Sequence, residues 1–421
     1  MHNTPRIYPH HIALPQNLRG ILSRLESRGY LAYIIGGCVR DSLLGIAPKD
    51  WDIATDARPE AICEIFANDN RATLIRTGSK YGTIGVCVHK VCYEITTFRN
   101  DGIYRDARRP ECVKFVSDLA IDITRRDFSI NALAYHPKQG VLDYVGGVED
   151  LRQGRIVCVG DARRRFSEDA LRILRAMRFR ATLGFGLDSR ARDALLELTH
   201  LLSTLPTERI RLELDKILMG AYASIVLREF AQVFAQLFAQ LAHQPQKSHA
   251  RFTPMLLECA QHIDRLDSLL ARYAWLLGGF GEEMRATLVQ NLCFSNAHKR
   301  QILSLLALLS LAPPRDDTQI LTLLSDFGAQ CVETALGLWT LRYGELEGLA
   351  VRVEYLARNA CYELKGLQIS GEEIKKLDKN IEGKRIGEIL KELLDEVIAQ
   401  KLPNMREPLI NRAKNLLTQA P

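Results

Sequence analysis

The chain has 421 residues, of which 47% are hydrophobic and 25% charged, and its formal net charge is +6. This length and composition are typical of a globular protein with two or more domains rather than one. No apolar run approaches the roughly 20 residues of a membrane-spanning helix, and the start "MHNTPRIYPHHIALPQ" lacks the pattern of a secretory signal, so we expect a cytoplasmic protein.

The first 150 residues mix short strand-like runs with helical ones. Clusters of β-branched residues occur in "YIIGG", "WDIAT", "ATLIRT", "GTIGVCV" and "VCYEITTF", and Gly, Asn or Asp residues bound them. Runs of this kind are typical of short strands separated by turns. We therefore predict a mixed-sheet α/β domain for this part of the chain.

After about Arg155 the strand signals nearly vanish, and Leu, Ala, Arg and Glu recur at helical spacing. In "FAQVFAQLFAQL" the spacing of four places Phe230, Phe234 and Phe238 on one face, which predicts a core stripe. Residues 243–254 show no period and are expected to link helical subdomains. The predicted fold class is therefore α+β, with a mixed-sheet head followed by an all-helical remainder.

The ten cysteines are single residues, most of them within apolar runs, and no Cys-x-x-Cys pair occurs. This pattern indicates neither a disulfide framework nor a zinc site, so we expect reduced core cysteines. Cys87 and Cys92 are the nearest pair, and they fall on a predicted hairpin whose alternating apolar side chains explain them.

Positive charge is concentrated between Arg155 and Arg180, where there are eight arginines and three acidic residues. A solvated helix face is the ordinary explanation of such a run. Here the arginines alternate with Ile, Leu, Met and Phe at helical spacing. This predicts a packed helix whose arginines face an anionic partner.

The segment "KDWDIAT" contains two carboxylates, Asp50 and Asp52, separated by one residue. In a β-strand both project from the same face, which suits the bridging of hard cations. Two Mg²⁺ ions about 3.5–4 Å apart activate an attacking hydroxyl and neutralise charge on a triphosphate. Most Asp-x-Asp pairs are turn or surface residues, so this pair gains meaning only from its neighbours.

Two neighbouring segments support the metal-and-phosphate interpretation. In "GGCVRD", Gly36 and Gly37 let backbone N–H groups approach phosphates at a helix start, and Arg40 lies one turn into that helix. A Gly-rich turn that only closes a strand is the alternative. Glu94 in "CYEITTFR" completes a carboxylate triad if its strand neighbours the Asp pair; otherwise it lies on a solvated face.

The segment "TRRDFSINALAY" places Arg125, Arg126 and Asp127 directly before an apolar run that we expect to be helical. The position of Asp127 is explained by the preference for acids at helix N-termini. The two arginines need an anionic partner, and a bound triphosphate is one.

The segment "EDALR" predicts that Asp169 and Arg172 share one face of a helix, either as a surface ion pair or as readers of a base. Asp accepts from an exocyclic amine and Arg donates to the adjacent ring nitrogen. Adenine and cytosine offer that order of groups, whereas uracil and guanine present the reverse. The pair would accept ATP and CTP, and Arg175 and Arg178 continue the face for phosphates or stacking.

Six segments together resemble the class II tRNA nucleotidyltransferases, the bacterial CCA-adding enzymes of the poly(A) polymerase and polymerase-β-like nucleotidyltransferase superfamily. In chain order they are "GGCVRD", "KDWDIAT", "TGSKYGTIGV", "TRRDFSINALA", "SEDALRILRAMRFRA" and "ERIRLELDKIL". The specific similarity covers about residues 30 to 220. Towards the C-terminus, "LQISGEEI" and "GKRIGEILKELLDEVI" resemble the tail of one branch of the family.

The resemblance implies a catalytic head (1–150), a helical neck that recognises the base (151–220), a helical body (221–275) and a helical tail that binds tRNA (276–421). It implies addition of C, C and A to tRNA 3′ ends from CTP and ATP, without a nucleic-acid template and with release of pyrophosphate. The partners implied are the acceptor and T arms of tRNA, with no membrane and no obligate protein partner.

The resemblance also implies the site residues. Asp50 and Asp52 would hold two Mg²⁺ ions, and Glu94 would be a further catalytic carboxylate. Nucleotide-binding positions would be Gly37, Arg40, Arg126, Asp169, Arg172, Arg175 and Arg178, with Asp169 and Arg172 serving as an amino-acid template for the base.

Three alternatives remain: an A-adding enzyme, a poly(A) polymerase and a non-catalytic RNA-binding module. Bacterial poly(A) polymerases carry an arginine-rich segment where this chain has "RTGSKYGTIGV", which disfavours that activity. Enzymes that add only CC lack a loop that this chain has at 100–115, with Tyr104, Asp106, Arg108 and Arg109. An A-adding enzyme keeps the loop and is the nearest rival; a non-catalytic RNA-binding module on the same fold is a rival of another class.

Overall fold

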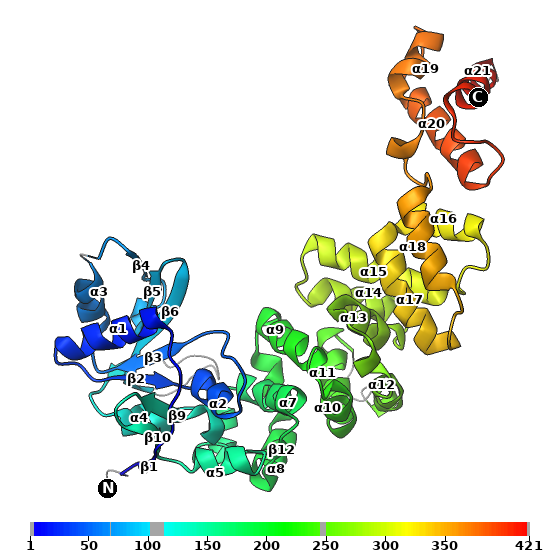
Figure 1. Ribbon diagram of the computed structural model, residues 1–421. Coiled ribbons are helices and arrows are strands. Elements are labelled where there is room, and N and C mark those ends of the chain that lie inside the picture. Colours follow the sequence, from blue (N-terminus) through cyan, green and yellow to red (C-terminus); the bar gives the residue numbers. More distant parts are fainter. Residues whose placement is uncertain (1–3, 68, 102–112, 245–249, 419–421) are drawn as a thin grey trace. The chain divides into compact units, whose positions relative to one another are not determined.

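A computed structural model describes residues 4–67, 69–101, 113–244 and 250–418. The chain divides into two compact units, Met1–Gln240 and Leu241–Pro421. All strands of the described chain lie in the first unit, and the second unit is helical (Figure 1). Among the described helices, none combines the length and apolar character needed to cross a bilayer.

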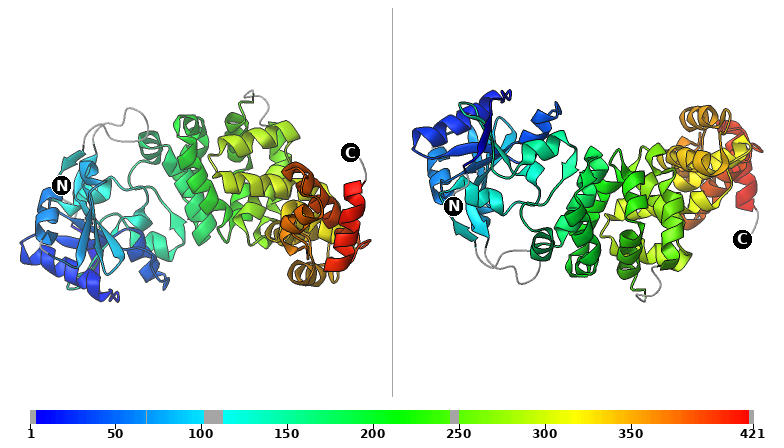
Figure 2. Two further views of the ribbon diagram at one scale, coloured as in Figure 1. Left: turned by 90° about the horizontal axis from the view of Figure 1, so that it is seen from above. Right: turned by 90° about the horizontal axis from the view of Figure 1, so that it is seen from below.

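An eight-stranded mixed sheet forms the core of the first unit, with the strand order β1-β10-β9-β2-β3-β6-β5-β4. Its strands are β1 (Arg6–Tyr8), β2 (Ala32–Ile35), β3 (Asp52–Thr55), β4 (Ala72–Ile75), β5 (Thr83–Val88), β6 (Val91–Thr97), β9 (Leu133–His136) and β10 (Gly140–Asp143). Neighbouring strands are antiparallel except β3 and β6, which run parallel. The sheet is confined to the blue and cyan part of the chain (Figure 2).

Helices cover the sheet because its central strands are apolar on both sides. All four residues of β2 and of β9 are buried, as expected for strands with packing on each face. Two of the covering helices, α1 (Gln16–Ser27) and α3 (Pro59–Phe66), contact each other and the strands below them. A third, α4 (Leu119–Thr124), packs Leu119 and Ile123 into a core cluster with sheet residues.

The remaining elements of the first unit are mostly helical. They are α2 (Gly37–Leu43), η1 (Ser79–Tyr81), β7 (Arg99–Asp101), β8 (Val113–Phe115), η2 (Ser129–Asn131), α5 (Gly147–Arg152), β11 (Arg155–Ile156), α6 (Ala162–Glu168), α7 (Leu171–Leu183), β12 (Gly186–Leu187), α8 (Ser189–Glu197), η3 (Thr199–Thr204), α9 (Thr207–Leu218), α10 (Ala223–Glu229) and α11 (Ala231–Leu241). The short strands β11 and β12 pair in parallel and are the exception to the predicted all-helical remainder.

The second unit consists of helices joined by short connections. They are α12 (Phe252–Ala260), η5 (Ile263–Arg265), α13 (Leu269–Gly278), α14 (Glu282–Asn291), α15 (Asn296–Ser310), α16 (Asp317–Phe327), α17 (Ala329–Tyr343), α18 (Leu349–Asn359), η6 (Leu364–Gly366), α19 (Gly371–Leu377), α20 (Gly383–Ile398) and α21 (Arg406–Thr418). The predicted link 243–254 ends in α12, and its residues 245–249 lie outside the described chain.

The predicted fold class is confirmed, but one predicted helix is wrong. The five strand-like runs of the head correspond to β2 through β6. The apolar run after Asp127 forms the short turn η2 and then strand β9, which pairs with β2 and β10. Hydrogen bonding to two neighbouring strands overrides the local helical pattern, since sheet pairing is a tertiary property.

The expectation of reduced cysteines is also wrong for one pair. Cys87 and Cys92 form a disulfide across the predicted hairpin, because β5 and β6 place them directly opposite each other. The turn residues His89 and Lys90 both have positive φ, as a tight two-residue turn requires. Four other cysteines are buried and free as expected: Cys38, Cys158, Cys259 and Cys331.

The phenylalanine stripe, which begins directly before α11 and continues along it, generates a stability prediction. Phe230, Phe234 and Phe238 are almost completely buried, which confirms the predicted core stripe. Phe234→Ala should lower the free energy of unfolding by about 3–5 kcal/mol through lost burial and a residual cavity. Urea titration followed by circular dichroism measures this. Gln232→Ala, at an exposed position of the same helix, should change stability little; equal effects of the two substitutions would contradict a core role.

Candidate active site

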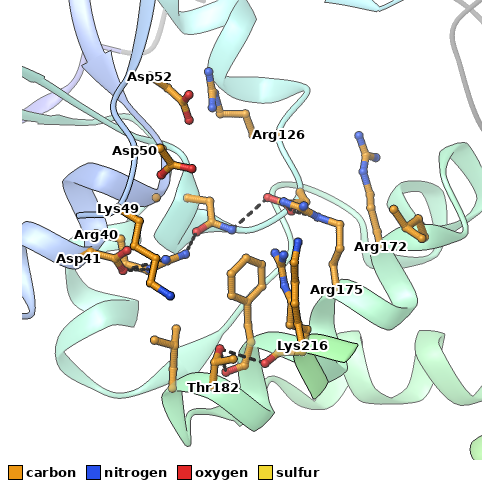
Figure 3. Close-up of a pocket in the computed structure, with 18 of the residues that line it drawn as sticks. Arg40, Asp41, Lys49, Asp50, Asp52, Arg126, Arg172, Arg175, Thr182 and Lys216 are labelled. Carbon is orange, nitrogen blue, oxygen red and sulfur yellow. Dashed lines mark hydrogen bonds and ion pairs between the residues drawn. The ribbon is translucent and has the colours of Figure 1, made fainter. Parts of the chain in front are cut away.

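A cavity of about 890 Å³ opens in the first unit. Its walls come from α2 and the segment before β3, from residues 125–131, and from the helices α7 and α9. Figure 3 shows Asp50 and Asp52 at one end beside Arg126, and Arg172 towards the other end. Of the predicted site residues, Glu94 alone is absent from the lining.

The carboxylates Asp50, Asp52 and Glu94 gather at one end of the site. Strand β3 begins at Asp52, so Asp50 lies in the segment before the strand rather than within it, contrary to prediction. The parallel pairing of β3 with β6 makes Asp52 and Glu94 register partners. Burial and the negative charges of Asp50 and Glu94 raise the pKa of Asp52 to about 6, although Arg126 opposes this.

The three carboxylates do not form a ready-made three-ligand metal site. Among the described residues, no group of three His, Cys, Asp or Glu side chains is arranged to hold a metal ion. Asp50 and Asp52 nevertheless project together into the cavity (Figure 3). Mg²⁺ is commonly bound by one or two carboxylates together with substrate phosphates, so the donor set fits an ion that arrives with a phosphorylated substrate.

The glycine turn before α2 is required by its backbone. Gly36 has φ +87, a conformation that favours glycine. A Cβ at this position would lie 3.5 Å from Nη1 of Arg126 and 3.9 Å from Oδ2 of Asp52. The turn therefore brings the backbone close to both the arginine and the carboxylate of the site, and Gly37 follows as the first residue of α2.

Arg126 is held beside the carboxylates by an acid on α4. Its Nη2 donates to Oδ2 of Asp122 over 3.0 Å, and Arg125 donates to the other oxygen of the same carboxylate. Burial alone would raise the pKa of Asp122, but the two arginines hold it below its usual value. The Nε of Arg126 is buried and has no hydrogen-bond partner among the residues that the structure describes.

A hydrogen-bonded chain of four side chains crosses the cavity wall. Arg40 donates to Oδ1 of Asn131, and Nδ2 of Asn131 donates to Oδ1 of Asp127 over 3.3 Å. Nε of Arg175 then donates to Oδ2 of Asp127 over 2.7 Å. Burial would raise the pKa of Asp127, yet Arg175, the Phe128 N–H and Asn131 lower it to about 2. Arg40 of α2 is thereby connected to Arg175 of α7.

The predicted pair Asp169 and Arg172 lies in one cavity, but the two residues do not share a helix face. Asp169 has extended backbone between α6 and α7, and Arg172 lies in the first turn of α7. Arg172 pairs with Glu168 over 2.8 Å instead, and its Nη2 donates to the Arg125 carbonyl over 3.0 Å. The alternative of a surface ion pair between Asp169 and Arg172 is therefore disfavoured, because Glu168 takes the guanidinium.

Phe179 organises the arginines further along α7. The guanidinium carbons of Arg40, Arg175 and Arg178 lie 5.1, 5.6 and 4.3 Å from the centre of its ring. Cations stack favourably on an aromatic face. Burial and the neighbouring Arg175 lower the pKa of Arg178, although Glu213 pairs with it over 3.3 Å. This part of the cavity favours an anion.

Sequence reasoning missed several lining residues, among them Lys49, Asn131, Phe179, Arg209 and Lys216. Arg209 and Lys216 are seven residues apart, and this spacing places them on one face of α9. That signal was present in "ERIRLELDKIL". The predicted loop at 100–115, with Tyr104, Asp106, Arg108 and Arg109, falls largely on residues 102–112, outside the described chain.

The cavity thus combines clustered carboxylates at one end with a series of guanidinium groups along its walls. Such a polarity suits a polyanion that arrives with divalent cations, because each end of the cavity compensates one of the charges. At the other end, the Asp169 carboxylate and the Arg172 guanidinium offer an acceptor and a donor to the edge of a ring.

Three family models match successive parts of the chain. They describe a poly(A) polymerase head domain (residues 32–157), a "Probable RNA and SrmB- binding site of polymerase A" (184–243) and a tRNA nucleotidyltransferase domain 2 (265–413). The first covers the carboxylates and the Arg125 to Asn131 segment.

Curated proteins with similar sequences are CCA-adding enzymes. The one from Lactiplantibacillus plantarum is 32% identical over 402 residues, which cover 95% of this chain and 96% of that enzyme. The one from Leuconostoc mesenteroides is 46% identical over 214 residues. That match covers 50% of this chain and 52% of the relative. The chain therefore spans about half the length of this relative in the match.

Solved structures show the same likeness. The Bacillus stearothermophilus CCA-adding enzyme in complex with CTP is 28% identical, has a TM-score of 0.76, and is matched over 95% of this chain and 98% of its own. The Thermotoga maritima CCA-adding enzyme complexed with tRNA, at 22% identity and a TM-score of 0.64 over 98% of this chain and 99% of that one, shows the shared fold.

The buried pair Asp127–Arg175 generates a pH prediction. The pKa of the Asp127 carboxyl is about 2 in the folded protein, against a usual 3.8. The ionised carboxylate therefore contributes fully to the free energy of unfolding above pH 3.8, and this contribution is lost as the pH falls through about 2. The free energy lost over that window is about 2 kcal/mol. Asp127→Asn should be destabilised at neutral pH, and its deficit relative to wild type should shrink towards pH 2. Urea titrations of both proteins at several pH values measure it; a constant deficit would contradict the depressed pKa.

Proposed function

The chain belongs to the CCA-adding enzyme family of tRNA nucleotidyltransferases, and on that premise we propose that it adds C, C and A to the 3′ ends of tRNA from CTP and ATP. It would do so without a nucleic-acid template and would release pyrophosphate. One observation carries the proposal: the carboxylates Asp50 and Asp52 and the base-edge groups of Asp169 and Arg172 line one cavity.

The phosphate half of the site is proposed as follows. Gly37, Arg40, Arg126, Arg175 and Arg178 would bind and orient the triphosphate, since guanidinium groups recognise phosphate oxygens through charge and paired donors. The buried Nε of Arg126, which has no hydrogen-bond partner within the described part of the chain, supports this role. The α-phosphate would then face the tRNA 3′ hydroxyl, which attacks in line.

Two Mg²⁺ ions are proposed at Asp50 and Asp52, with Glu94 as an accessory carboxylate. The raised pKa of Asp52 supports this, because burial and the neighbouring negative charges would be compensated by a cation. Bound Mg²⁺ would supply activation of the hydroxyl and neutralisation of the triphosphate charge. The protein's own contribution is to fix the two carboxylates beside Arg126.

The base half of the site is proposed to accept only adenine and cytosine. An ionised Asp169 accepts from N6–H₂ or N4–H₂, and Arg172 donates to N1 or N3. Arg172 is held by Glu168 and by the Arg125 carbonyl, so its direction is set before the base arrives. We further propose that residues 151–220 form the base-reading neck, 221–275 the body and 276–421 the tRNA-binding tail, beside the catalytic head 1–150.

Primers of three lengths test the proposal. Purified protein is offered tRNAs that end before the first C, after one C and after both Cs, each with labelled CTP or ATP alone. We expect C on the first two and A only on the third. Incorporation of A after CC without any C addition would establish the A-adding rival. Long A tails on generic RNA would establish a poly(A) polymerase, and no incorporation at any Mg²⁺ concentration would support a non-catalytic module.

Substitution of the metal carboxylate is the second test. Asp52→Asn should lower nucleotide incorporation by about 10³-fold or more, because several kcal/mol of charge stabilisation are lost. The fold should be kept, as measured by circular dichroism and thermal unfolding. Glu60→Gln, at an exposed position of α3, is the matched control and should retain activity. Unchanged incorporation by Asp52→Asn would contradict the metal assignment.

A further inference from the structure

Arg209 contacts the base-reading carboxylate from a third helix. It lies in the first turn of α9, and its Nη2 is 3.4 Å from Oδ2 of Asp169. The helix is anchored by Ile210 and Leu214, which are fully buried, so the backbone position of Arg209 is fixed. Its Nη1 is buried and has no hydrogen-bond partner in the described chain, although it belongs to a residue that lines the cavity.

The backbone of Asp169 is hydrogen-bonded to the Arg165 carbonyl of α6 and to the Arg172 N–H of α7, so the orientation of its side chain depends on further contacts. Its backbone is extended, with φ −143, in the connection between α6 and α7. Oδ1 accepts from the Leu171 N–H over 3.1 Å, and Oδ2 faces Arg209. One contact on each oxygen defines the plane of the carboxylate. Each carboxylate oxygen has a second lone pair, so an acceptor position remains for the amine of a base.

Three arginines surround Asp169, but two of them are already paired with other carboxylates. Burial raises the pKa of Asp169, and Arg209 is the largest opposing influence, followed by the Leu171 N–H and by Arg172. The guanidinium of Arg172 is bound by Glu168, and that of Arg175, which also faces Asp169, is bound by Asp127. Arg209, in contrast, forms its ion pair with Asp169 itself.

We infer that Arg209 is a positioning residue that acts through Asp169, keeping its carboxylate ionised and correctly oriented for the exocyclic amine of cytosine or adenine. The inference rests on the proposed function and extends it to a residue outside the predicted base-reading pair. A protonated Asp169 would offer a donor instead of an acceptor to that amine, and discrimination against uracil would fall.

The test is the pH dependence of nucleotide binding without tRNA. CTP and UTP are titrated calorimetrically into wild type, Arg209→Gln and Arg209→Lys from about pH 5.5 to about pH 8.5. Removing the guanidinium should let the pKa of Asp169 rise, so CTP binding by Arg209→Gln should weaken at a pH about one unit higher than in wild type. Its preference for CTP over UTP should fall most at the acidic end, and Arg209→Lys should restore much of both.

The matched control is Arg163→Gln, which removes an exposed arginine of α6 that pairs with Glu197. It should leave both curves unchanged. Equal loss of CTP and UTP binding by Arg209→Gln at every pH would overturn the inference, because it would indicate a phosphate contact or a folding defect. An unshifted CTP curve would overturn it as well. If wild type binds CTP but does not extend tRNA, the proposed function fails while the curves still decide the role of Arg209.

Discussion

Several guanidinium groups lie together in one cavity, and the need to compensate their charge determines how the surrounding elements are held. Like charges at short range repel strongly where water is partly excluded, so each arginine must be compensated. Arg175 reaches across to Asp127, and Arg172 reaches the carbonyl of Arg125. The compensating groups belong to the segment that follows α4, whereas these arginines belong to α7. The same interactions therefore compensate charge in the cavity and attach α7 to the segment that follows α4.

Charge is incompletely compensated in two parts of the cavity, and the two excess charges have opposite signs. This difference determines which ligands the site can bind. Burial, together with the negative charges of Asp50 and Glu94, raises the pKa of Asp52 to about 6. Around Arg178 the excess is positive, and its pKa is lowered by burial and by Arg175. A substrate that carries phosphates together with divalent cations relieves both excesses at once.

Local patterns predicted the elements of this fold, and non-local contacts account for what they missed. Alternating apolar residues identified β2 to β6, since that periodicity is contained in each segment. Whether Glu94 lies beside Asp52 depended on strand order, so the sequence could state it only as a condition; the β3–β6 pairing meets it. Strand β9 was mistaken for a helix because its partners lie elsewhere in the chain.

For the candidate site, too, local patterns predicted some features, and others depended on contacts between distant parts of the chain. The residue types and spacing identified most of its lining, but not the partner of each side chain. The three-residue spacing suggested that Asp169 and Arg172 pair, whereas Glu168 takes the guanidinium and Arg209 faces the carboxylate. Cys87 and Cys92 are joined because a two-residue turn sets them opposite each other, which residue spacing alone did not reveal.

The extended backbone at Asp169 has a geometric consequence for a site that serves two bases. A purine is wider than a pyrimidine, so with the phosphates held in place the reading edges of the two bases reach to different depths. Arg172 is clamped on two sides and cannot follow that difference. The side chain of Asp169, between two helices, is held by one N–H and one long ion pair. If Asp169 and Arg172 read the base as proposed, the adjustment from the smaller base to the larger would therefore fall on the side chain of Asp169.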